Sequence, residues 1–144
     1  MKRFMMIVLV CVLTVMMIPV SAADEMEKED PVVIEPRYEA TSLFTANFYI
    51  NGNTATLSTS YVGLSTFSYA RLYRYIDKKV ADAWVKPTTS EPCSWTGTFY
   101  ERNNVVENTL TLTSRGTYRG RTIAYLYATN GLYDKLEDGN QVIY

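Results

Sequence analysis

Alternation of apolar and polar residues is the dominant pattern of this chain beyond its first 40 positions. From Tyr118 to Tyr127 every second residue is one that suits a core, and the residues between them are mostly charged or aromatic. A period of two indicates a β-strand with one face toward a core. The row predicted to face the core is Tyr118, Gly120, Thr122, Ala124 and Leu126.

The same period recurs in shorter runs, which predict further strands. The first of these runs places Phe44, Ala46, Phe48 and Ile50 on one face. No helix is predicted beyond the first 23 residues. Seven to eight short strands separated by turn signals predict an all-β chain, folded as an antiparallel β-sandwich. The runs are 43–50, 54–62, 67–76, 80–86, 94–100, 105–113 and 118–127, with a closing strand that ends at 141–144.

Turn signals fall between these runs. Asn51-Gly52 predicts a hairpin with a type I′ turn, because both residues tolerate positive φ. Asp77-Lys78-Lys79 is predicted to be a turn as well. The step Gly116-Thr117-Tyr118 resembles a tyrosine corner, in which the tyrosine hydroxyl bonds back to the loop before its strand. We therefore expect Asn51, Gly52, Gly116 and Tyr118 to have structural roles.

This layout resembles immunoglobulin and fibronectin type III domains. It is more similar to a group of small secreted β-sandwich proteins of Gram-positive bacteria, through Asn51-Gly52, Leu72-Tyr73-Arg74, Trp84 and Gly116-Thr117-Tyr118-Arg119. The resemblance covers residues 40–144 and implies an immunoglobulin-like fold and an extracellular location, but no activity. Antibody domains differ, because they have a cysteine where this chain has Gly120 and a tryptophan within the strand corresponding to 67–76.

The first 23 residues read as a secretory signal peptide. Two basic residues precede an apolar run over 4–20, and Val20-Ser21-Ala22-Ala23 supplies small residues for cleavage. A permanent anchor is the alternative, but the run is shorter than the roughly 20 residues of a bilayer span and Pro19 lies at its end. Val10 before Cys11 is not the small residue of a lipoprotein signal. We expect a secreted chain that does not remain inserted in a membrane.

Charge is unevenly distributed along the chain, although the total is only −1. Residues 24–39 hold seven acids and two bases, a net −5, and predict a disordered acidic spacer or a short propeptide. Residues 40–144 hold ten bases and eight acids, a net +2, and form the predicted domain. Neither value is large enough to predict binding to nucleic acid or to a membrane surface.

Candidate chemistry is sparse. The chain has no histidine, which removes the usual nucleophile–base pairs and the commonest zinc ligand. After loss of the leader Cys93 is the only cysteine; it is either a reactive thiol or, as we favour, a small half-buried hydrophobe.

The acids of the domain are expected in turns. The oxygen ligands that could gather around Ca²⁺ lack the spacing of an EF-hand loop. We expect no enzyme, metal or cofactor. The acids are Asp77, Asp82, Asp134, Glu137 and Asp138, and the calcium candidates are three of these with Asn140.

Aromatic residues are the strongest functional signal, with twelve tyrosines and two tryptophans. The outward rows of two strands that neighbour each other in an immunoglobulin-like sheet would form a surface of tyrosine and arginine. Such a surface suits a glycan or a protein ligand. It also suits a sheet face whose cross-strand pairs only stabilise the sheet, or the interface of a homodimer. The candidate residues are Tyr69, Arg71, Tyr73, Tyr75, Arg119, Arg121, Tyr125 and Tyr127.

Overall fold

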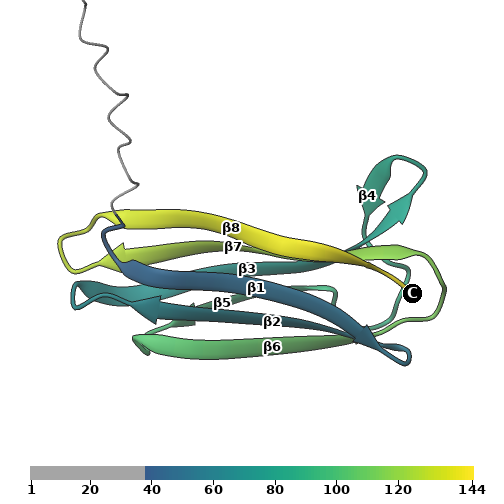
Figure 1. Cartoon of the computed structure of the whole chain (residues 1–144), viewed down its shortest axis with the longest axis horizontal. Helices are drawn as coiled ribbons and strands as arrows, with labels where there is room; N and C mark the ends of the chain where they lie inside the picture. The colour runs from purple at the N-terminus through teal and green to yellow at the C-terminus, as the bar shows by residue number, and fades with distance from the viewer. Residues whose placement is uncertain (1–37) are drawn as a thin grey trace, which may run out of the picture. The chain divides into compact units, whose positions relative to one another are not determined.

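The computed structural model describes residues 38–144, and all of its regular secondary structure is β-strand (Figure 1). The predicted all-β chain of antiparallel strands is confirmed. The proposed leader and nearly all of the acidic spacer lie outside the described residues. The strands are β1 (Thr41–Asn51), β2 (Thr54–Gly63), β3 (Phe67–Val80), β4 (Ala83–Val85), β5 (Ser94–Phe99), β6 (Asn103–Thr111), β7 (Thr117–Ala128) and β8 (Tyr133–Ile143).

The strands form two antiparallel sheets. One has the order β1-β2-β6, and the other has the order β8-β7-β3 with both β4 and β5 on the remaining edge of β3. β5 pairs with residues 70–75 and β4 with residues 78–80, so the two together act as one interrupted edge strand. Residues 86–93 leave the sheet between them, and β4 projects away from the other strands (Figure 1).

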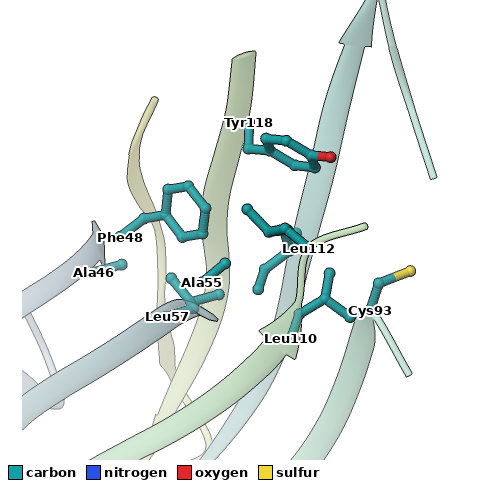
Figure 2. Close-up of a cluster of buried hydrophobic side chains, with 9 residues drawn as sticks. Ala46, Phe48, Ala55, Leu57, Cys93, Leu110, Leu112 and Tyr118 are labelled. Atoms are coloured by element: carbon teal, nitrogen blue, oxygen red, sulfur yellow. The ribbon is translucent and has the colours of Figure 1, made fainter. Parts of the chain in front are cut away.

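The core lies between the two sheets and consists of two apolar clusters. The first includes Phe48, Leu57 and Leu110, and Figure 2 shows these side chains converging near the ring of Tyr118. The two predicted inward rows are confirmed, since they supply Ala46, Phe48 and Tyr118 to the first cluster and Ala124 and Leu126 to the second. Gly120 belongs to the inward row because a Cβ there would meet the Phe48 ring at 2.6 Å. The second cluster is Ala40, Tyr61, Ala70, Leu72, Ala124, Leu126 and Ala128.

A polar layer separates the two clusters. The hydroxyl groups of Thr59 and Thr122, one from each sheet, form a hydrogen bond of 2.7 Å. Arg74 lies beside Thr122 in the ladder and is only 4% exposed. Its Nε and Nη1 atoms have no hydrogen-bond partner in the described part of the chain, and its guanidinium lies 5.9 Å from the ring centre of Phe99. Burial lowers the pKa of Arg74, because water no longer solvates the charge.

β1 and β8 join the two sheets on one side, and side chains of β8 make the connection. The Asp134 carboxylate accepts hydrogen bonds from the backbone N–H groups of Glu39, Ala40 and Thr41 at 2.8–3.0 Å. Residues of the predicted spacer therefore reach into the fold, because Glu39 is held in this way. The remaining contacts are the N–H of Ala46 with Asp138 at 2.8 Å, and the N–H and C=O of Phe48 with Asn140 at 2.6 and 2.7 Å.

Two predicted turns differ in the structure. Asn51 is the last residue of β1 and pairs with Thr54, so the central turn residues are Gly52 and Asn53. Gly52 has a φ of 59° and Asn53 is not among the residues with positive φ, a pattern of type II′ rather than the predicted type I′. The hairpin is therefore correct, but its turn is shifted by one residue.

The second corrected turn is the one predicted at Asp77-Lys78-Lys79. β3 continues through these residues and turns at Ala81 and Asp82, where Ala81 has a φ of 52°. Asp77 thus becomes a strand residue with an outward side chain. Three consecutive charged residues that begin with an aspartate favour a turn, but here they extend a strand whose end pairs with β4 and β7.

The tyrosine corner is present at the start of β7. The Tyr118 hydroxyl donates a 2.7 Å hydrogen bond to the backbone carbonyl of Ser114, four residues earlier, and Tyr118 is 1% exposed. Gly116 exchanges two backbone hydrogen bonds with Tyr144. These contacts fix the loop that carries the chain from one sheet to the other.

Candidate functional site

The outward face of β3, β7 and β8 carries all eight candidate residues. β3 pairs with β7 so that Tyr69 lies opposite Tyr127, Arg71 opposite Tyr125, and Tyr75 opposite Arg121. Seven of the eight side chains are half-buried by their neighbours, and Arg71 is exposed. The shared face expected from the alternation is thus formed. We call this surface the outer face.

β8 adds three residues to the outer face that the sequence reading did not assign. Tyr133, Lys135 and Glu137 lie opposite Tyr127, Tyr125 and Ile123 of β7. The sequence pattern could have placed them there, because these three residues alternate with Asp134 and Leu136 along the strand. The acids around them were read as turn residues, which hid the alternation.

Four tyrosine rings form a continuous row across one end of the outer face. Tyr69 and Tyr127 are stacked, with ring centres 4.4 Å apart and an angle of 13° between the rings. Tyr100 adjoins Tyr69 at 6.1 Å, and Tyr133 adjoins Tyr127 at 5.3 Å. Each inner ring is therefore stacked on one face and has a tilted aromatic neighbour in addition, which restricts its rotamers before any ligand arrives.

A hollow of about 260 Å³ lies beside this row, between β3 and β7. Ile123 is its apolar residue, and Tyr73 and Tyr125 meet edge to face with ring centres 6.0 Å apart. Lys135 lies over the ring of Tyr125, with its Nζ 5.8 Å from the ring centre. The hollow is lined by Arg71, Tyr73, Tyr75, Ile123, Tyr125 and Tyr127.

The other end of the outer face is a network of paired charges. Asp77 lies 3.0 Å from Arg119 and 3.5 Å from Arg121, and Arg121 lies 3.5 Å from Glu137. The guanidinium of Arg119 also lies over Trp84, 4.5 Å from the ring centre. A second hollow of about 480 Å³ borders these groups. Because both acids are paired with arginines, this end offers less free charge than its composition suggests.

The calcium candidates do not converge on one point. Glu137 points to the outer face and pairs with Arg121. Asp134, Asp138 and Asn140 instead accept hydrogen bonds from the backbone of β1 and of the residue before it. The assignment of these acids to turns is wrong, since all of them lie within β8. Residues 38–144 contain no group of three or more acidic or cysteine side chains placed to hold a metal ion.

Cys93 is a core residue. Its side chain is 4% exposed and belongs to the first apolar cluster with Leu110 and Leu112. Its backbone carbonyl accepts a 2.9 Å hydrogen bond from the N–H of Ile76, which anchors the end of the segment 86–93. The thiol therefore packs as a small hydrophobe.

No protein-family model, curated protein or solved structure matches this chain. Among the residues that the structure describes, none belongs to a helix long and apolar enough to cross a membrane. The geometry of the outer face is therefore the feature of this chain that bears most directly on function.

Proposed function

We propose that this chain is an exported, non-catalytic binding module with an immunoglobulin-like fold, which captures a macromolecular ligand at or near the cell surface. The strand orders β1-β2-β6 and β8-β7-β3-β5 and the tyrosine corner at Tyr118 support the immunoglobulin-like type. The basic start and apolar run of residues 1–23 support export.

The observation that carries the proposal is the tyrosine-lined hollow on the outer face. Tyrosines contribute large, rigid contact areas at a low entropic cost, which is why binding surfaces are enriched in them. Here the rings are already held by one another and by Lys135, so a ligand would order few side chains on arrival. The absence of histidine and the pairing of Asp77 and Glu137 with arginines favour binding over catalysis.

The test replaces two tyrosines that line the hollow. We expect Tyr73→Ser/Tyr125→Ser to weaken ligand binding about 100-fold, because each ring is a central contact of roughly 1–2 kcal/mol. Ligands are found with the unsubstituted chain on a glycan array and in a cell-wall pull-down, and affinities are then measured by titration. The matched control is Tyr49→Ser, since Tyr49 is 48% exposed on the first sheet.

The outcomes separate three readings of the outer face. Lost binding in a double variant that still unfolds cooperatively above the assay temperature supports the proposal, and retained affinity in the double variant contradicts it. If sedimentation instead shows a dimer that the double variant abolishes, and no ligand is found, then the outer face serves self-association.

A further inference from the structure

The ring geometry of the outer face discriminates between a sugar and a protein ligand. A pyranose ring binds an aromatic residue by lying flat against an open ring face. In the tyrosine row, Tyr69 and Tyr127 each cover one face of the other, and the exposed rings of Tyr100 and Tyr133 adjoin them at angles of 42° and 39°. A ligand that approaches these inner rings therefore meets ring edges and hydroxyl groups, which is the way tyrosines contact proteins in antibody paratopes.

The charges around the hollow also bear on the kind of ligand. Arg71 and Lys135 lie on opposite sides of Tyr125 in the ladder. Within residues 38–144, the ion pairs of the outer face involve only Asp77, Glu137 and the two arginines of β7. The end with the tyrosine row thus holds two cations without an acidic partner, one on each side of a central ring, whereas the other end is neutralised.

The lining of the hollow favours an apolar group over a sugar. Its lining is Ile123, four tyrosines and Arg71, so a sugar that filled it would place part of its hydroxyl groups against ring carbon. An aromatic or branched apolar side chain loses no hydrogen bond on entering such a space. The surroundings therefore combine one apolar socket with a cation on either side.

We infer that the ligand of this face is a protein segment that places one apolar side chain over Ile123 and carboxylates beside Arg71 and Lys135. The inference rests on the proposed function, because it specifies the ligand of the same site. The carboxylates bind the guanidinium and the ammonium as exposed ion pairs, and the apolar side chain supplies the buried anchor. The association weakens as ionic strength rises, since salt screens the two ion pairs.

A random peptide library displayed on phage tests the inference with the exported chain as bait. Peptides that bind the unsubstituted chain but not Tyr73→Ser/Tyr125→Ser are collected and sequenced. We expect them to be enriched in Asp or Glu next to an aromatic or branched apolar residue. Their affinity for Arg71→Met/Lys135→Met should fall about tenfold, which is about 1.4 kcal/mol shared by two ion pairs.

The control removes a cation from the same strand away from the hollow. Lys79→Met takes away an exposed charge near β4, and peptide affinity should stay within about twofold. Tyrosine-dependent peptides without acidic enrichment, or without a response to Arg71→Met/Lys135→Met, would overturn the inference and leave the binding module intact. Tyrosine-dependent glycan binding with no tyrosine-dependent peptide would do the same. If nothing binds in a tyrosine-dependent way, the proposed function fails as well.

Discussion

The two sides of this fold at which the edge strands of the two sheets meet are closed in different ways. On one side the edge strands β1 and β8 are joined, because Asp134, Asp138 and Asn140 bond to backbone groups of the opposite sheet. On the other side the edge strands are β5 and β6, and no hydrogen bond links them within the described residues. There, Arg74 and the Oδ1 atom of Asn108 are buried without hydrogen-bond partners.

The difference shows that side-chain groups can replace the backbone hydrogen bonds of a ladder at the edge of a sheet. At the β1/β8 side, carboxylate and amide groups satisfy free backbone N–H groups, so both edges are blocked without a shared ladder. At the β5/β6 side, the segment 86–93 provides partial cover, since Glu91 accepts a 2.8 Å hydrogen bond from the N–H of Thr111. We therefore expect polar side chains to stabilise the first side and to add little, or to cost stability, at the second.

The largest effect is expected at the β1/β8 side from Asp134→Ala. Asp134 is 7% exposed and accepts three backbone hydrogen bonds, so its loss leaves buried donors without partners. We expect the free energy of unfolding to fall by about 3 kcal/mol in urea denaturation. Asp134→Asn keeps one acceptor oxygen and should lose less. A loss below about 1 kcal/mol for Asp134→Ala would show that water replaces the carboxylate at little cost.

An effect of opposite sign is expected from Arg74→Met on the other side. Methionine keeps much of the apolar stem of Arg74 and removes a buried charge that has no hydrogen-bond partner at Nε and Nη1. We expect the free energy of unfolding to rise by about 1 kcal/mol, after the loss of the contact with Phe99 is subtracted. Chemical denaturation measures the change. A clear fall in stability would mean that the guanidinium contributes a favourable interaction in solution, and the contrast between the two sides would then disappear.

The smallest effect concerns Glu91, which is exposed and caps the end of β6. The hydrogen bond from Thr111 lowers the pKa of Glu91 below its ordinary value, because it favours the carboxylate. The stabilising contribution is therefore complete above the unfolded-state pKa and is lost as the pH falls through the folded-state pKa. The stability difference between the natural chain and Glu91→Gln should be present near pH 7 and vanish near pH 2. A difference that does not depend on pH would show that the charge of Glu91 has no part in the cap.

Alternation predicted the faces of the strands well because burial on one side of a sheet constrains every second residue. The inward row from Tyr118 to Leu126 and the outward rows that hold Tyr73 and Tyr125 are examples. The same rule places Arg74 in the inward row between Leu72 and Ile76. Its hydropathy gives no indication of this, so the polar layer could not be predicted from composition.

Turns and side-chain partners were harder to predict. Asn51-Gly52 correctly predicted a hairpin, but the turn lies one residue later than expected. Its central residues are Gly52 and Asn53, and the positive φ is at Gly52. Asp134 and Asp138 were assigned to turns since acids are common there, whereas their partners are backbone groups more than 90 residues away. Such distant pairs leave no mark in a local pattern.

The β1/β8 side also constrains when this domain can fold. The groups that hold residues 39–48 belong to β8, at sequence separations of 92 to 95 residues. As the chain is synthesised, its first strand therefore has no complete set of partners until nearly all of the domain has emerged. Contacts of such long range form late and slowly. We therefore expect the β1/β8 side to close last during folding, after the local hairpin of β1 and β2 has formed.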